Sequence, residues 1–462
     1  MGIYSGEDAI AYLEAKQFRQ AINEAYFGRT PGINRCFNAF CDFRHKYVDA
    51  SFLRGVKNID ADHDKDLRLF ISEMERQFGF ESFSFIISNS LTENMMTIPV
   101  MFHDGIPSKV NIKDWIVIDK EGYHFKDKAK VSCIIIAYPM LLFDASISDE
   151  EAFAAVLHEV GHNFQAFING TMINMALGRS IMQIYAIIFS LISSFARLDF
   201  AKIKTITLTV LLSYTRTHSA ASKLYNKLTS DTNRNNLYSY FNFVRGIMAV
   251  PKDIGMALIA IPLAPILGLI SNWNDLVSVL NPIGIYQHSY DYMGERIADA
   301  FPSYYGFGNY MVSFNTDNPT GRMFGFGAKA VGSIPFIGHI YNAMLMPAYI
   351  LACIGDEHPA DIVRSKSLID SMKSDLSDPT LSPKLRANLK KEIDESEKLI
   401  NEYFENAKAT DPNITKILFE KWLFVTLNGG FKYKVYKSLF NINDEDINNK
   451  IKQESADYND IL

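Results

Sequence analysis

The spacing of hydrophobic and polar positions changes along this chain of 462 residues, and each change predicts a different kind of element. Residues 6–80 repeat apolar side chains at intervals of three and four, as in DKDLRLFISEMERQF, which predicts helices. Residues 82–143 instead carry short runs rich in Ile, Val and Phe, separated by Asn, Pro, Gly and Asp. These runs predict the strands of a small sheet: SFSFIIS, MMTIPVMF, WIVID and KVSCIIIAY.

Helical spacing returns after the last of these runs. Ser148 followed three residues later by Glu151 forms a capping box, which predicts the start of the helix AFAAVLHEVGHNFQAFI. We expect Asn169 and Gly170 to end that helix. The run KVSCIIIAY before it has two interpretations: an edge strand on which an extended peptide pairs, or a central strand, as its continuous apolar character suggests.

Two stretches further along are unusually apolar. Residues 180–196 and 254–274 hold about 17 and about 21 uncharged residues, close to the length that crosses a bilayer. They predict membrane association, or a hydrophobic insertion packed on the rest of the protein or in an oligomer. Pro262 and Pro265, and a mean hydropathy near zero for the whole chain, weaken the membrane interpretation. A third apolar stretch covers residues 330–355.

The chain becomes polar and helical after Arg364. Ser382 and Pro383 predict the start of a helix with one apolar stripe. The positions of that stripe are Leu385, Leu389, Ile393, Ile400, Phe404 and Ala407. We expect this helix to form a hairpin with an earlier one that presents Leu368, Met372 and Leu376.

Composition excludes several classes of protein. The net charge of −6 gives no electrostatic surface for nucleic acid, so we expect no nucleic-acid partner. The amino terminus has early acidic residues and helical periodicity, without the pattern of a signal peptide. The cysteines form no C-x-x-C pair, which favours a reducing compartment over a disulfide framework. They are Cys36, Cys41, Cys133 and Cys353.

The stretch LHEVGH carries the clearest chemistry. Residues four apart share a face of a helix, so His158 and His162 can present two imidazoles to one Zn²⁺ ion, with Glu159 beside them. Zinc lowers the pKa of a bound water toward neutrality, and a glutamate at that position can take the proton. The sequence therefore predicts a catalytic zinc site on this helix.

A catalytic zinc ion requires a third protein ligand. Glu295 in YMGERIADAF is the best candidate, and Asp291 and His288 in the same segment are alternatives. Asp299 lies four residues after Glu295, so it could accept a hydrogen bond from a ligand histidine and fix its tautomer.

These motifs resemble the gluzincin zinc metallopeptidases related to HtpX and the CAAX prenyl protease, which carry HExxH on one helix and E-x-x-A-D on a later one. The strand, the "L-L" turn and the acidic helix start before LHEVGH are similar too, as is DEHPADIVR at residues 356–364. The resemblance spans residues 82–364. It implies zinc ligands at His158, His162 and Glu295, a general base at Glu159, Asp299 behind the ligands, and His358 and Arg364 near the active site.

The family's membrane members usually begin with transmembrane helices, and none is predicted here before residue 170. The segment after residue 365 has no counterpart in the family. We therefore expect a predominantly helical α+β fold, with a zincin-like catalytic core, a hydrophobic helical insertion and a helical C-terminal extension. The expected divisions are a helical region at 1–80, the sheet and zinc helix at 81–170, the insertion at 171–285, the second half of the core at 286–364, and the extension at 365–462.

The first functional hypothesis is a zinc-dependent endopeptidase that acts on a protein or peptide. In it, Glu159 is the general base, and His358 or Arg364 steadies the developing oxyanion. The second hypothesis is a structural or assembly protein that keeps the zinc fold as a scaffold. It arises because ERIADAFPSYYGFG looks similar to segments of proteins of large tailed bacteriophages, and in that setting the chain would be a virion component. A third possibility, a membrane quality-control protease like those of the HtpX group, has the same chemistry as the first hypothesis and differs only in where the protein resides.

Overall fold

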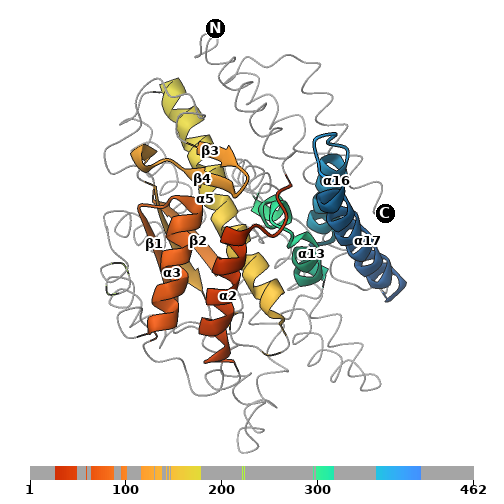
Figure 1. Ribbon diagram of the computed structural model, residues 1–462, viewed down its shortest axis with the longest axis horizontal. Helices are drawn as coiled ribbons and strands as arrows, with labels where there is room; N and C mark the ends of the chain where they lie inside the picture. The colour runs from red at the N-terminus through yellow and green to blue at the C-terminus, as the bar shows by residue number, and fades with distance from the viewer. Residues whose placement is uncertain are drawn as a thin grey trace, which may run out of the picture.

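The described part of the chain is mostly helical, with a three-stranded sheet and a two-stranded hairpin, as predicted for an α+β chain (Figure 1). The computed structural model describes part of the chain in detail. The described residues are 26–48, 64–87, 95–100, 116–129, 131–137, 147–177, 298–316 and 361–406, with isolated positions at 59, 142, 145, 221, 223 and 295.

The sheet has three strands in the order β1-β5-β2. Strand β5 (Ser132–Ala137) lies in the centre and is buried at every position. Strand β1 (Ser82–Ile87) pairs with it in parallel, and strand β2 (Met95–Val100) pairs with it antiparallel. The edge-strand interpretation of KVSCIIIAY is therefore wrong, because its continuous apolar run is buried between two neighbouring strands.

A separate hairpin joins β3 (Ile116–Asp119) to β4 (Gly122–Phe125). The sequence predicts β3 and misses β4, because a strand of four residues that begins with glycine has little apolar pattern of its own. The glycine is needed there: Gly122 has a φ of 112°, and a Cβ at this position would lie 2.5 Å from the Tyr305 hydroxyl. That hydroxyl accepts the Tyr123 N–H at 2.9 Å, which joins the hairpin to the second half of the chain.

Two helices from the N-terminal part of the chain cover one face of the sheet. Helix α2 (Pro31–His45) begins at a Thr30 cap, with proline in its first turn. Helix α3 (Lys65–Phe78) begins at Asp64, which accepts two backbone N–H groups, and ends at Gly79 in the left-handed conformation. Aromatic rings fill the space between the layers, as in the edge-on contact of Phe70 with Phe85 at 5.3 Å. The predicted helix before residue 26 lies outside the described residues.

Helix α5 (Asp149–Leu177) is the predicted zinc helix, and it lies against strand β2 and the central strand β5. It begins at the predicted capping box but does not end at Asn169 and Gly170. Glycine inside a helix costs only about 1 kcal/mol relative to alanine, so it lowers helix stability without breaking the hydrogen-bonding pattern. The helix thus runs for 29 residues.

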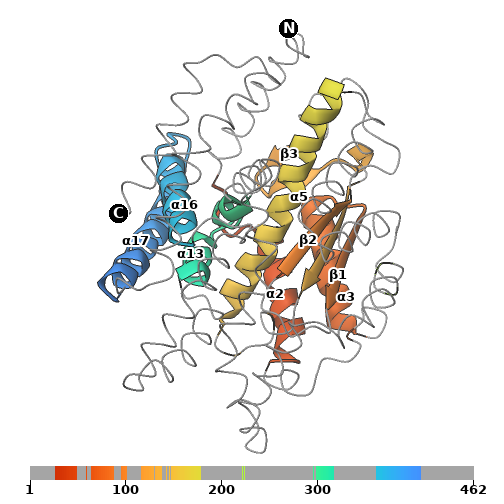
Figure 2. The same cartoon turned by 180° about the vertical axis from the view of Figure 1, so that it is seen from behind.

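The second half of the described chain is helical and lies on the side of α5 away from the sheet (Figures 1 and 2). Residues 298–304 are helical and lead through a turn at Gly306 into α13 (Gly308–Thr316). Helices α16 (Asp361–Leu376) and α17 (Pro383–Asn406) contact each other and both contact α13. Since α13 also contacts α5, this helical layer is continuous with the helix that carries LHEVGH.

Helices α16 and α17 form the predicted hairpin. Leu368 and Met372 are buried, and so are Leu389 and Ile393 on α17. Phe404 was expected on the same stripe, but it is 39% exposed because the stripe leaves the hairpin interface before the end of α17. Ala407 lies outside the described residues. Helix α16 also runs without interruption across the predicted division at 364/365, so the extension begins inside a helix that reaches the core.

The hydrophobic insertion predicted at 171–285 lies almost entirely outside the described residues. This includes both apolar stretches, 180–196 and 254–274, and the third stretch at 330–355. Among the described residues, no helix has the length and apolar character that a membrane crossing requires.

Candidate metal centre

The start of α5 is held by two sets of polar contacts. The Ser148 N–H donates to the Glu151 carboxylate at 2.8 Å, and the Glu151 N–H donates to the Ser148 hydroxyl at 3.2 Å, which is the predicted capping box. Arg44, 3% exposed, donates to the carbonyls of Leu142 and Ile147 and pairs with Asp149. The loop that enters α5 is thus fixed from helix α2.

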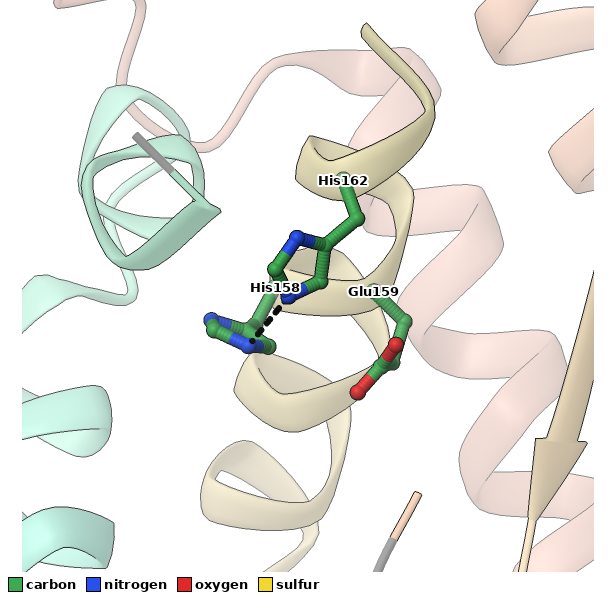
Figure 3. A group of neighbouring side chains, drawn as sticks. All are labelled: His158, Glu159 and His162. Carbon is green, nitrogen blue, oxygen red and sulfur yellow. Dashed lines mark hydrogen bonds between the residues drawn. The ribbon is translucent and has the colours of Figure 1, made fainter. Parts of the chain in front are cut away.

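His158 and His162 lie one turn apart on the same face of α5 (Figure 3). Their Nε2 atoms are 3.1 Å apart, and the two rings are nearly perpendicular, with centroids separated by 4.6 Å. The side chain of His158 is buried, and that of His162 is partly open to solvent. Two ring nitrogens at this distance are close enough to bind one metal ion.

Gly161 lets a second helical segment approach α5 closely. A Cβ at this position would lie 2.8 Å from the Phe301 Cβ, 2.9 Å from the Ala298 Cα and 3.0 Å from the Ala298 carbonyl oxygen. Ordinary carbon–carbon contacts are about 3.5–4.0 Å, so any larger residue would push the segment away. The segment that this glycine admits also carries residue 295.

Glu295 reaches both imidazoles from this second segment. One carboxylate oxygen lies 3.3 Å from His158 Nε2, and the other lies 3.2 Å from His162 Nε2. A tetrahedral zinc ion with bonds of about 2.0–2.1 Å separates its ligand atoms by about 3.3 Å. Each of the three separations, 3.1, 3.2 and 3.3 Å, is therefore close to the distance between two zinc ligands, with a different Glu295 oxygen facing each imidazole.

Asp299 lies behind the imidazole of His158. Its carboxylate is 2.9 Å from His158 Nδ1, and Arg364 holds the same carboxylate through two contacts, Nε to Oδ2 at 2.8 Å and Nη2 to Oδ1 at 2.6 Å. Arg364 Nη2 also lies 3.4 Å from Glu295. A carboxylate in this position fixes the tautomer that leaves Nε2 available to a metal ion. One arginine thus orients both acidic residues.

These contacts shift the pKa values of the buried groups. Burial alone raises the pKa of Asp299, but the Arg364 guanidinium and His158 outweigh it and lower the pKa to about 2, so the group stays ionised. Burial lowers the pKa of His158, yet hydrogen bonds to Asp299 and Glu295 raise it above its ordinary value. Such acidic surroundings favour a cation at the imidazole, and a metal ion competes with the proton for that position.

Glu159 is buried beside the two imidazoles on α5 (Figure 3). Among the described residues, Glu159, His158 and His162 each place one ligand atom within 4.8 Å of the others. The Glu295 oxygens lie 3.2 and 3.3 Å from the two rings, so both carboxylates are within reach of an ion held by the imidazoles.

The structure brings together six of the seven site residues that the sequence predicts. They are His158, Glu159, His162, Glu295, Asp299 and Arg364. His358 lies outside the described residues, as do the alternative ligands His288 and Asp291. Sequence reasoning did not single out Gly161, although a glycine inside a predicted helix is a signal of close packing. It also missed Asn163, for which no sequence signal is evident.

Comparison with known proteins identifies no relative. No model of a protein family matches the chain, and neither a curated protein nor a solved structure matches it.

Proposed function

We propose that this protein is a zinc-dependent metalloendopeptidase that hydrolyses peptide bonds, built on a zincin-like core. The observation that carries the proposal is that His158 and His162 lie 3.1 Å apart through Nε2, with a Glu295 oxygen 3.2–3.3 Å from each ring and the buried Glu159 beside them. Three protein ligands and one open position are typical of catalytic zinc sites, whereas structural zinc sites use four protein ligands.

Each residue has a role that its position supports. When bound, the zinc ion would polarise the scissile carbonyl and make a water molecule more acidic. Glu159 takes a proton from the attacking water as its oxygen bonds to the carbonyl carbon, and gives it to the leaving nitrogen as the C–N bond breaks. The products are a carboxylic acid and an amine.

Arg364 has a different role from the one the sequence suggests. We expected it, or His358, to donate to the oxyanion. Its guanidinium is instead buried against Asp299 and Glu295. Arg364 therefore supports the proposal by holding the two acidic residues in place rather than by contacting substrate.

A peptide substrate fits the position of strand β2. Among the described strands, β2 lies at an edge of the sheet, and it lies against the zinc helix. An extended peptide can add to an exposed sheet edge through main-chain hydrogen bonds. Because β5 is central, β2 replaces it as the strand on which we expect substrate to pair.

The test is Glu159→Gln, which preserves the shape of the side chain and removes its basicity. We expect wild-type protein to bind one equivalent of zinc and to cleave an unstructured protein such as casein, with loss of cleavage when zinc is chelated. The variant should keep its zinc and lose about 10²–10⁴-fold in kcat. Glu150→Gln, on the same helix and paired only loosely with Arg29 at 4.0 Å, is the matched control and should retain both.

Two results would count against the peptidase. Equal cleavage by the wild type and the Glu159→Gln variant would remove the proposed base from the mechanism. Stoichiometric zinc without turnover of any peptide library, together with copurification with particles, would favour the structural or assembly protein instead.

A further inference from the structure

Asn163 lies at a junction between the zinc helix and the sheet. It follows His162 directly but points in the direction of Glu159, since residues four apart share a helix face. Its side chain is completely buried. This residue is therefore on the sheet side of α5, opposite the imidazoles.

The Asn163 amide nitrogen contacts three different elements. It donates to the Thr97 hydroxyl on β2 at 2.7 Å and to the Cys133 sulfur on β5 at 2.9 Å. It also lies 3.2 Å from the backbone carbonyl of Glu159 on its own helix. One amide group thus connects the turn that carries Glu159 to two adjacent strands.

The strand contacts meet on one face of the sheet. In the register of β2 against β5, Thr97 is opposite Ile135 and Pro99 is opposite Cys133, so Thr97 and Cys133 are diagonal neighbours. Thr97 in turn donates to the Ile134 carbonyl at 3.4 Å. Asn163 therefore fixes the position of α5 relative to strands β2 and β5, both its distance from them and its position along them.

The two ends of the Asn163 amide differ in their partners. The nitrogen has the three contacts above, whereas the Oδ1 atom is buried and has no hydrogen-bond partner among the described residues. A buried acceptor without a partner costs free energy, which offsets part of the stabilisation from the nitrogen contacts. The amide therefore adds less to the free energy of unfolding than its contacts suggest, while its nitrogen still fixes the geometry of three elements.

We propose that Asn163 is a positioning residue that sets the distance between Glu159 and strand β2, and so between the general base and an extended peptide paired on that strand. This inference rests on the proposed function. A displacement of about 1 Å at a reacting group can lower a rate about 100-fold, so a fixed link between base and substrate strand has a large effect on kcat.

The test compares Asn163→Leu with Thr97→Val and a control. Asn163→Leu keeps the branching and the number of heavy atoms of the side chain and removes the amide, and we expect a melting temperature within about 3 °C of wild type, unchanged zinc content, and kcat lowered about 10–100-fold with little change in KM. Thr97→Val removes only the hydroxyl contact and should lower kcat in the same direction. Gln77→Leu removes a comparable amide contact, Nε2 to the Glu121 carbonyl at 2.8 Å, away from the metal centre, and should leave kcat unchanged.

A second measurement does not depend on catalysis. Hydrogen exchange of the backbone amides at 95–98 and 100 should become faster in Asn163→Leu and stay at the wild-type rate in Gln77→Leu. Wild-type kcat in Asn163→Leu, or a reduced kcat that Thr97→Val does not share, would overturn the proposal. If the wild-type chain itself cleaves nothing, the proposed function fails, and the exchange rates alone then decide whether Asn163 links α5 to β2.

Discussion

Replacing Gly161 by alanine tests whether the close approach of two helical segments creates the metal centre. The added Cβ would meet Phe301 and Ala298 at 2.8–3.0 Å, and two of these contacts involve backbone atoms of Ala298. Restoring ordinary contact distances requires the segment that carries Glu295 to move by roughly 0.7 Å. Metal–ligand bonds tolerate deviations of only about 0.2 Å, so we expect the Glu295 bond to zinc to weaken.

Gly161→Ala should change the stability of the zinc-free fold little and lower its affinity for zinc clearly. Overpacking costs about 1–3 kcal/mol, while alanine in place of glycine stabilises a helix by about 1 kcal/mol, so the net loss without zinc is about 0–2 kcal/mol. Zinc affinity should fall about 10–100-fold, which corresponds to about 1.4–2.8 kcal/mol. The apoprotein should therefore remain folded while its metal site is impaired.

The measurements are zinc competition against a chromophoric chelator and urea denaturation of the zinc-free protein. Gly308→Ala is the control, because its new Cβ would be crowded to a similar degree, by the Met372 Sδ atom at 2.6 Å and the Ser303 Cβ at 3.0 Å, but not by the segment of Ala298 and Phe301. We expect this control to bind zinc like wild type. A Gly161→Ala variant with wild-type zinc affinity would refute the argument that this glycine sets the position of Glu295.

Two further changes test the electrostatics. Asp299→Asn keeps the shape of the residue behind His158 but removes its charge, so zinc affinity should fall about 10–100-fold in the same competition assay, and an unchanged affinity would contradict its orienting role. Glu392, on α17, is buried where it accepts the Tyr26 hydroxyl at 2.5 Å and the Gly308 N–H at 3.2 Å, and burial raises its pKa from 4.5 to about 7. Because the pKa of Glu392 is higher in the folded state than in the unfolded state, its protonated carboxyl stabilises the fold fully below pH 4.5. This stabilisation is lost as the pH rises through 7, which lowers the free energy of unfolding by about 3 kcal/mol. Urea denaturation of Glu392→Gln from pH 4 to pH 8 should lack this slope, and a slope like that of wild type would show that another group causes it.

The C-terminal hairpin of α16 and α17 is joined directly to the candidate metal centre, across the division predicted at 364/365. Helix α16 begins next to the centre, where Arg364 holds Asp299 and Glu295, and continues into the hairpin with α17. Helix α17 contacts α13, which in turn contacts the zinc helix. The segment expected to be a separate extension thus shares its first helix with the site.

The sequence by itself determined the local features of this protein. The capping box at Ser148 and Glu151, the helical spacing of His158 and His162, and the apolar runs of β1, β2 and β5 were predicted because each depends on neighbours within a few residues. The order of the strands depends on pairing between distant segments, so the sequence left open whether β5 is an edge or a central strand.

Only the tertiary structure decided how the parts of the site meet. Glu295 could be proposed as a ligand from its motif, but its distance to the imidazoles depends on the space that Gly161 leaves between two helical segments. The change of Arg364 from a substrate contact to a partner of Asp299, and the bond from Asn163 to Thr97, depend on three-dimensional neighbours in the same way. Local patterns specify elements and candidate chemistry, whereas close packing between elements sets the distances, of about 3 Å, on which coordination and proton transfer depend.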